Sequence, residues 1–361
     1  MHLAVDLGHR SSAAGDDDPW APVRLAQEAE RLGYRVAFAP EAYGTDAVTV
    51  LTAVAATTTR IDVGSAVLQL PARSAAMTAM TTASLDALSG GRFRLGLGVS
   101  GPQVSEGWHG VRFDAPLART REYVAVVRSA LRREEVRADG PHLRLPLPDG
   151  PGKALRLSVT PLRADVPVYL AAVGPKNLEL AGEVADGWLG VLVAPEHLPE
   201  SLARIEAGRA RAQTPPTRPF DVVAAVPARP SGGASVAEDD DAGRLAPLRA
   251  RLALYVGGMG SRQQNFYNAL AVRLGHEQEA ALVQELYLDR RHREAAAAVP
   301  RGLLEATCLV GPPEAVRDRL AAYAAAGVTT LSVVPEGRST GEKAAVLRDV
   351  ADALAASGAG S

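Results

Sequence analysis

Three side chains in the first third of the sequence could move protons. Glu41 directly follows a short apolar run, whereas Glu106 and His109 lie three residues apart in a glycine-rich stretch. A carboxylate and an imidazole this close together suit acid–base chemistry, because histidine titrates near neutral pH. A simpler interpretation stays open in each case. Glu41 could cap a helix that begins near Thr45, and the Glu106 segment could be a surface loop anchored by Trp108.

The same stretch contains Gly96, Gly98 and Gly101 in the G-x-G-x-x-G spacing of dinucleotide-binding proteins. That motif requires a helix directly behind the strand, within the first βαβ unit of a domain. Here no apolar helical pattern follows until about Leu117, and three strand–helix units precede the glycines. We therefore predict a long loop at the carboxyl end of a barrel strand, where small residues let a ligand approach the backbone.

Two further segments have the composition of ligand-binding sites. Gly64, Ser65 and Ala66 continue the third expected strand with small side chains that leave room in a barrel interior; close core packing is the alternative. Residues 171–177 combine a glycine, a proline suited to a first helical turn, and Lys176. Free N–H groups at such a helix start attract phosphate, whereas an ordinary strand-to-helix turn is the alternative here.

Composition argues against several classes of protein. The 361 residues include 39 Lys and Arg and 41 Asp and Glu, and the net charge of −2 favours neither nucleic acid nor a membrane surface as partner. The sequence has no H-E-x-x-H, C-x-x-C, Walker A or G-x-S-x-G motif, so we expect no metal site. The single Cys308 and a strand-like amino terminus indicate a cytoplasmic protein.

Short β-branched runs alternate with alanine-rich helical patterns, which is typical of βα units and a parallel sheet. Strands are expected at residues 3–7, 35–39, 61–68, 92–97, 166–171, 188–193, 221–226 and 329–334. Helices are expected at residues 22–32, 47–58, 75–88, 117–133, 177–184, 198–212, 314–325 and 342–356. These alternating units predict an α/β fold of the (β/α)8 TIM-barrel type, with the candidate side chains at the carboxyl ends of the strands.

Two regions interrupt the alternation. We expect one domain over residues 1–361, with insertions at about 134–165 and 229–304. The first insertion is rich in Pro and Gly. The second begins with a surface loop at 229–243 and continues as a helical segment at 244–304, and long insertions of this kind often form lids or subunit contacts.

Together and in this order, the motifs resemble the luciferase-like monooxygenase superfamily. The closest similarity is to its branch that uses the deazaflavin coenzyme F420, which includes methylenetetrahydromethanopterin reductase-like proteins. The resemblance is carried by residues 40–44, 89–98, 100–104, 106–110, 120–123, 169–176, 185–188, 259–260 and 265–267, including Ser89-Gly-Gly-Arg-Phe-Arg-Leu-Gly-Leu-Gly98.

The resemblance implies that coenzyme F420 binds at the carboxyl ends of the strands, with Glu41 near the edge of its flat ring. The ring would lie against a bulged third strand at Gly64, Ser65 and Ala66, where relatives often have a non-proline cis peptide. The helical insertion would cover the site. Further contacts are implied for Gly98, Val99, Ser100, Gly101, Gln103 and Val104 along the ring and ribityl tail, and for Val173, Gly174, Pro175 and Lys176 at the phosphate.

We therefore predict an enzyme, a coenzyme F420-dependent oxidoreductase that transfers a hydride between the deazaflavin and a small-molecule or peptide substrate. Glu41, Glu106 and His109 are the candidates for handling protons, and a homodimer is expected. An FMN-dependent monooxygenase and a non-catalytic flavin-binding protein are the alternatives. Sugar-phosphate dehydrogenases of the superfamily have an acid where this chain has Gly101 and a histidine where it has Ala42, which argues against a sugar-phosphate substrate.

Overall fold

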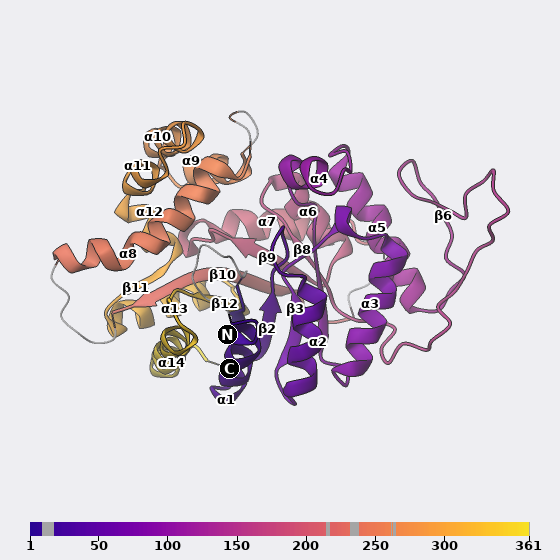
Figure 1. Cartoon of the computed structure of the whole chain (residues 1–361), viewed down its shortest axis with the longest axis horizontal. Helices are drawn as coiled ribbons and strands as arrows, with labels where there is room; N and C mark the ends of the chain where they lie inside the picture. Colours follow the sequence, from indigo (N-terminus) through magenta and orange to yellow (C-terminus); the bar gives the residue numbers. More distant parts are fainter. Residues whose placement is uncertain (9–17, 214–216, 232–237, 261, 263–264, 361) are drawn as a thin grey trace.

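A computed structural model describes residues 1–8, 18–213, 217–231, 238–260, 262 and 265–360. In this part of the chain, eight parallel strands form a closed barrel (Figure 1). β9 pairs with β10, β10 with β12 and β12 with β1, which completes the ring and confirms the predicted TIM barrel. The barrel strands are β1 (His2–Asp6), β2 (Val36–Ala39), β3 (Asp62–Ser65), β5 (Phe93–Gly98), β8 (Val168–Ala171), β9 (Gly187–Val191), β10 (Asp221–Pro230) and β12 (Thr330–Pro335).

Helices surround the barrel, and several begin at the caps that the sequence contains. Asp46 and Ser74 precede two of these helices, and each side chain accepts a hydrogen bond from a backbone N–H of the first turn. The surrounding helices are α1 (Ala21–Arg31), α2 (Ala47–Thr57), α3 (Ala75–Leu88), α5 (Pro116–Leu131), α6 (Pro175–Val184), α7 (Leu198–Arg209), α13 (Pro313–Ala325) and α14 (Thr340–Ser357). None of the helices in the described part of the chain is long and apolar enough to cross a membrane.

The strand pleat decides which side chains enter the barrel. Ala4, Phe38 and Tyr169 belong to a small cluster inside it, whereas Val5 belongs to the larger core between the strands and the helices. Because side chains alternate along a strand, Asp6 has the same orientation as Ala4. Asp6 therefore points inward at the carboxyl end of β1. The carboxyl ends of the eight strands together form one end of the barrel, which we call the barrel mouth.

The opposite end of the barrel is closed by an arginine. Arg94 donates to Asp62 Oδ2 at 2.7 Å, to the Tyr169 hydroxyl at 2.9 Å and to Asp221 Oδ2 at 3.1 Å. These partners come from β3, β8 and β10. The network joins strands across the amino-terminal end, the end of a TIM barrel that contributes to stability and leaves the mouth for function.

Two groups of additional elements extend the barrel. The first is an arm after α5 with the antiparallel strands β6 (Ala138–Asp139) and β7 (Arg144–Leu145). The second is a helical insertion before the last barrel strand, and its buried residues form a separate hydrophobic cluster. It comprises α8 (Glu238–Ala253), the π-helix η4 (Leu254–Gly258), α9 (Phe266–Arg273), α10 (Glu277–Leu288), α11 (His292–Ala297) and α12 (Arg301–Thr307). Figure 1 shows it to one side of the mouth, away from the arm.

Two predictions around the third and fourth strands were wrong. The third strand is interrupted: β3 ends at Ser65, and a separate pair of residues, β4 (Leu68–Gln69), continues beside β5 after a cis peptide bond between Ala66 and Val67. A helix, α4 (Pro102–Gly107), does follow Gly101, although none was predicted. Its six residues are too few to produce a recognisable apolar period.

Two further differences lie in the second insertion. β10 extends to Pro230 and α8 begins at Glu238, so the surface loop expected at 229–243 is shorter, and residues 232–237 lie outside the described part of the chain. The short strand β11 (Leu309–Gly311), which pairs with β10, was not predicted. It has three residues and follows directly on a helix, so no alternating pattern marks it. The remaining short elements are η2 (Leu70–Ala72) and η3 (Pro195–His197).

Candidate active site

The interruption of the third strand explains two of the three glycines in the dinucleotide-like motif. Ser65 Oγ donates to Gly96 O at 2.8 Å and accepts from Gly96 N at 2.9 Å. A Cβ on Gly96 would lie 1.9 Å from Ser65 O, and one on Gly98 would lie 2.5 Å from Val67 Cγ2. These glycines are therefore required for close approach between β3, β4 and β5, not for a phosphate.

Glu41 lies at the mouth, as predicted, but its carboxylate is fully engaged. Arg73 contacts it through two bonds, Nη1 to Oε2 at 2.6 Å and Nη2 to Oε1 at 2.8 Å. The pair is largely buried, with 8% of the Glu41 side chain and 15% of the Arg73 side chain exposed. Arg73 also pairs with Asp46, the cap of α2. Glu41 thus joins the end of β2 to the segment behind β4.

Further hydrogen bonds fix this segment. Gln69 Nε2 donates to Ala42 O at 2.7 Å, and Ser100 Oγ donates to Gln69 Oε1 at 3.1 Å. The Tyr123 hydroxyl donates to Arg73 O at 3.1 Å. Burial raises the pKa of Tyr123 to about 12, so this phenol stays protonated and remains a donor at neutral pH. These hydrogen bonds connect the polar groups at the ends of β2, β4 and β5. We call this part of the mouth the loop side.

The other two proton-handling candidates lie on and just after α4. Glu106 Oε1 accepts from Phe113 N at 3.0 Å, and this bond ties the helix to the chain that follows it. His109 Nε2 is buried and has no hydrogen-bond partner among the described residues. Trp108 between them is 66% exposed, so it does not anchor the loop in a core. No hydrogen bond or ion pair in the described structure joins Glu41, Glu106 and His109 to one another.

The loop implied to contact the cofactor connects β5 to α4. Ser100 adopts a left-handed backbone conformation, with φ of 62°. Gly101 is the cap of α4, and a Cβ there would meet only Gln103 Oε1, at 3.5 Å. Val99 and Val104 complete the segment. The left-handed residue turns the chain at the end of β5, so this loop borders the mouth beside the interrupted strand.

The expected phosphate segment begins α6. Gly174 is the helix cap, Pro175 is the first helical residue, and Lys176 is exposed. Gly174 has an ordinary φ of −81°, and a Cβ there would meet nothing within 4 Å. Neither backbone conformation nor packing therefore requires glycine at this position. Pro175 has no N–H and Asn177 N donates to Gly174 O at 3.0 Å, so the open space and the positive helix end are what suit an anionic ligand here.

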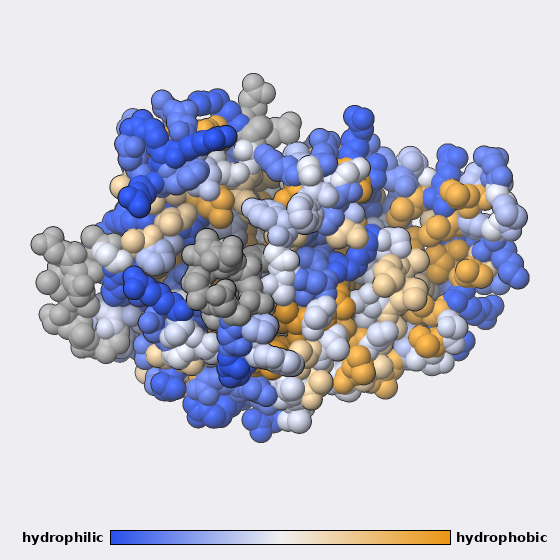
Figure 2. Space-filling model, in the orientation of Figure 1, coloured by the Kyte–Doolittle hydropathy of each residue, from blue (hydrophilic) through white to orange (hydrophobic). Residues whose placement is uncertain are grey.

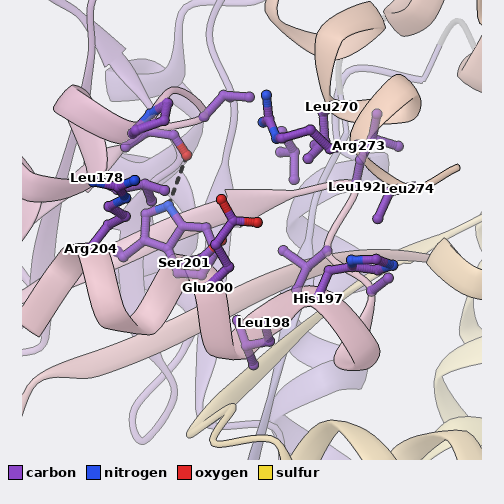
Figure 3. Close-up of a pocket in the computed structure, with 17 residues that line it drawn as sticks. Leu178, Leu192, His197, Leu198, Glu200, Ser201, Arg204, Leu270, Arg273 and Leu274 are labelled. Carbon is purple, nitrogen blue, oxygen red and sulfur yellow. Dashed lines mark hydrogen bonds between the residues drawn. The ribbon is translucent and has the colours of Figure 1, made fainter. Parts of the chain in front are cut away.

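A cavity adjoins this helix start (Figure 3). Val173 and Pro175 line one side, Arg204 of α7 another, and Arg273 of α9 comes from the helical insertion. Trp188 Nε1 donates to Ala172 O at 2.9 Å and fixes the cavity wall. Glu200 also lines the cavity, and Arg204 pairs with Glu179 at 3.4 Å, so the cavity carries charges of both signs beside the positive end of α6.

A polar cluster that the sequence analysis did not identify lies at the mouth where β1 and β12 end. Arg251 Nε donates to Glu336 Oε1 at 2.6 Å. Tyr255 and Asp6 are close enough to change the pKa of Arg251 by their charges. We call these four residues the Tyr255 cluster. Asp6 ends the first barrel strand and Glu336 follows the last, so the rule that selected Glu41 could have found both.

A sequence model of the luciferase-like monooxygenase family matches residues 2–330. The chain belongs to this family. A protein of Mycobacterium tuberculosis named as a coenzyme F420-dependent oxidoreductase is 41% identical over 345 residues, which cover 92% of this chain and 96% of the relative. A 5,10-methylenetetrahydromethanopterin reductase of Methanolobus tindarius is 36% identical over 200 residues, 55% of this chain and 58% of that protein.

The fold comparison agrees with the family assignment. The solved structure of a coenzyme F420-dependent tetrahydromethanopterin reductase from Methanopyrus kandleri has a TM-score of 0.79 to this chain at 24% identity, over 99% of both chains. This likeness shows a shared luciferase-like barrel. The resemblance identified from sequence motifs is therefore confirmed at the level of family and fold.

The mouth of this luciferase-like barrel has features that fit a flat, phosphorylated cofactor. The cis peptide implied by the resemblance lies between Ala66 and Val67, in the interrupted strand. Gly174 leaves open space at the helix start, and His109 Nε2 is a buried polar atom without a partner. No group of His, Cys, Asp and Glu among the described residues could hold a metal ion. The individual cofactor contacts stay predictions.

Proposed function

We propose that this protein is a coenzyme F420-dependent oxidoreductase that acts as a reductase on an organic substrate. The observation that carries the proposal is the relative named as a coenzyme F420-dependent oxidoreductase, which is 41% identical and matches nearly the whole of both chains. The bound deazaflavin would supply the hydride, and the protein would supply orientation and electrostatics.

In this proposal the interrupted strand holds the ring. Gly64, Ser65 and Ala66 would lie beneath it, and the segment from Gly98 to Val104 would lie along its edge and its ribityl tail. Gly64 and Ser65 are buried, and a Cβ on Gly64 would lie 2.6 Å from the Phe38 ring, whereas Ala66 is partly exposed. The hydrogen bonds between Ser65 and Gly96 keep the strand ends in place.

The cofactor phosphate would lie at the start of α6. Val173, Gly174, Pro175 and Lys176 are the proposed contacts, and the adjoining cavity extends toward Arg273. The positive end of α6 would stabilise the phosphate charge.

We reduce the three candidates for proton transfer to two residues, Glu106 and His109. Glu41 is held in a bidentate pair with Arg73, so we propose that it positions the loop side of the mouth. Glu106 and His109 stay proposed catalytic residues. His109 Nε2 is buried without a hydrogen-bond partner among the described residues, so a partner from a bound ligand would satisfy it.

Direct titration tests the proposal. Purified protein is titrated with coenzyme F420 and, separately, with FMN, and binding is followed by fluorescence. We expect micromolar or tighter binding of the deazaflavin and much weaker binding of FMN. A preference for FMN would move the assignment to the monooxygenase alternative, and binding of neither would refute the proposed cofactor chemistry.

We also propose a homodimer in which two copies meet through α2 and α3. All exposed residues of these two helices are uncharged; they are Thr49, Thr52, Ala56, Thr57, Ala76, Met77, Met80, Ser84, Ala87 and Leu88. Met80 is 52% exposed and Leu88 is 64% exposed. Figure 2 shows hydrophobic surface gathered over these helices and the arm. An uncharged face can meet its own copy across a two-fold axis without repulsion.

The domain organisation, the cellular location and the kind of substrate are also proposals. We propose a single domain over residues 1–361 with the arm and the helical insertion as its additions. A cytoplasmic location is supported by the single cysteine, Cys308, which is buried. The substrate is proposed to be a small molecule or peptide that enters at the barrel mouth.

A further inference from the structure

The Tyr255 cluster lies where a substrate of a TIM barrel would lie. Asp6 points inward at the end of β1, and Glu336 follows the neighbouring β12, where its N–H donates to Ala228 O at 3.0 Å. Arg251 and Tyr255 come from α8 and η4 of the helical insertion. The cluster therefore joins the insertion to the mouth through an ion pair between Arg251 and Glu336.

Tyr255 is held by a π-helix, which is an uncommon turn that is frequent at functional sites. The wider turn leaves carbonyl groups without helical partners, and Asn265 satisfies two of them. Its Nδ2 donates to Tyr255 O at 3.2 Å and to Val256 O at 2.8 Å. The backbone at Tyr255 is thus fixed from outside the helix.

The ring of Tyr255 is fixed as well. It meets the Tyr267 ring edge-on, with centroids 4.9 Å apart and planes at 87°. A Cβ on Gly257 or Gly258 would lie within 2.5 Å of Tyr287, so η4 packs closely on α10. A phenol held this rigidly costs little further ordering when it binds a ligand.

The charges around Tyr255 favour a hydroxyl that keeps its proton. Burial raises the pKa of this phenol, the Arg251 guanidinium lowers it by charge and by a hydrogen bond, and Asp6 raises it. The net shift is upward. Because arginine can only donate, the phenolic oxygen accepts from Arg251, and its own proton is directed elsewhere. Tyr255 is therefore a donor, not a base, at neutral pH.

Two of the proton candidates on the loop side, Glu41 and Glu106, already accept hydrogen bonds within the protein. Glu41 is occupied by Arg73 through both carboxylate oxygens. Glu106 accepts a backbone hydrogen bond, and Trp108 beside it is exposed. The Tyr255 hydroxyl, which comes from the helical insertion, would donate to a substrate that lies between the insertion and the barrel.

We propose that the Tyr255 hydroxyl is a catalytic hydrogen-bond donor to the carbonyl oxygen of the substrate, with Arg251 and Glu336 as positioning residues. The inference rests on the proposed function and names its substrate class, a carbonyl compound. The carbonyl carbon gains a hydride from the reduced coenzyme, the π electron pair moves to oxygen, and that oxygen takes one proton from water. Tyr255 keeps its own proton and stabilises the negative charge as it develops.

The test compares Tyr255→Phe with Tyr267→Phe in the full-length protein. The first substitution removes the proposed donor and keeps the ring, whereas the second removes a neighbouring hydroxyl outside the cluster. Each protein is loaded with reduced coenzyme F420 and mixed with a panel of aldehydes and ketones. We expect Tyr255→Phe to lower kcat/KM for the best acceptor by about 100-fold, in the range of a lost oxyanion donor. Tyr267→Phe should stay within about threefold of the wild type, because its hydroxyl is not proposed to touch substrate.

A second readout does not depend on turnover. Calorimetry measures binding of the non-reducible amide analogue of that acceptor to the protein loaded with oxidised coenzyme. We expect Tyr255→Phe to bind the amide about tenfold more weakly, as for one lost hydrogen bond, with an unchanged Kd for the coenzyme. Glu336→Gln should lower activity in the wild-type background and have no further effect in Tyr255→Phe, because it acts through Arg251 on the same hydroxyl.

Three results would overturn the inference. Tyr255→Phe could retain wild-type activity and amide affinity, or Glu336→Gln could have its full effect in the Tyr255→Phe background. The wild type could also bind coenzyme F420 and reduce none of the carbonyl compounds, which would refute the substrate class while leaving the proposed function intact. Failure to bind the coenzyme at all would refute the proposed function itself, and the inference with it.

Discussion

Arg73 and Glu41 form a bidentate pair on one side of the barrel mouth, with distances of 2.6 and 2.8 Å between their nitrogen and oxygen atoms. The pair joins the end of β2 to the segment behind the interrupted third strand. This geometry assigns Glu41 to positioning, because both of its oxygens are occupied in a largely buried ion pair. The sequence alone could not distinguish this positioning role of Glu41 from a role in proton transfer.

Glu41→Gln is expected to destabilise the fold by about 3 kcal/mol, because it leaves a buried guanidinium partly unpaired. Urea unfolding measures the free-energy change. The double variant Glu41→Gln/Arg73→Met should lose much less than the sum of the two single variants, since the two residues act as one unit. If Glu41→Gln instead kept full stability and lost all activity, Glu41 would be a proton-transfer residue, as the sequence analysis predicted.

The sequence predicted the barrel well because its evidence is repeated along the chain. Most of the barrel strands contain β-branched residues and most of the surrounding helices are rich in alanine, so one error does not change the count. The site was harder to predict. Gly96 and Gly98 spell a phosphate motif but serve close strand packing, which depends on the break after Ser65. Nothing in their spacing reveals that contact.

The Tyr255 cluster was missed for a different reason. Asp6 and Glu336 are separated by nearly the whole chain and become neighbours only when β1 pairs with β12 and closes the barrel. Tyr255 comes from the helical insertion, and no periodic pattern in the sequence predicts where that insertion packs on the barrel. By contrast, Gly174 and Pro175 were recognisable because a helix start is a local feature.

The uncharged face on α2 and α3 predicts the effect of a charge on oligomeric state. Met80→Glu would place two carboxylates near a two-fold axis and is expected to convert a dimer into a monomer. Light scattering coupled to size exclusion measures the mass. Leu282→Glu on α10 is the matched control, since Leu282 is also half-exposed but lies on the helical insertion. A dimer that survives Met80→Glu would exclude this face, and a monomeric wild type would refute the homodimer.

Glu30 predicts how stability depends on pH. Its Oε1 accepts hydrogen bonds from the N–H groups of Thr59, Arg60 and Ile61 at 2.6–3.0 Å. Burial raises the pKa of this carboxyl, but the backbone hydrogen bonds outweigh burial and hold the pKa below its usual value. Because the folded pKa is the lower one, the stabilisation is complete above the unfolded pKa and is lost as pH falls through the folded pKa.

Glu30→Gln is therefore expected to lower the free energy of unfolding by about 1 kcal/mol at neutral pH, because the glutamine oxygen can still accept these hydrogen bonds and only their charge-assisted part is lost. The difference between the two proteins should shrink as the pH falls below 4.5. Urea unfolding across that pH range measures it. A difference that stays constant down to the lowest pH would show that the charge of Glu30 has no part in the stabilisation.

Gly174 separates ligand binding from folding more cleanly than any other position in the site. Its φ of −81° suits alanine, and a Cβ would meet no atom within 4 Å, so Gly174→Ala should raise the melting temperature slightly or leave it unchanged. A bound phosphate at the start of α6 would meet that methyl group. We expect the Kd for coenzyme F420 to rise at least about tenfold, the loss of roughly one hydrogen bond. Gly243→Ala is the control, because that glycine also has open space around it but lies in α8. Equal affinity in Gly174→Ala and wild type, measured by the same fluorescence titration, would remove the phosphate from this helix start.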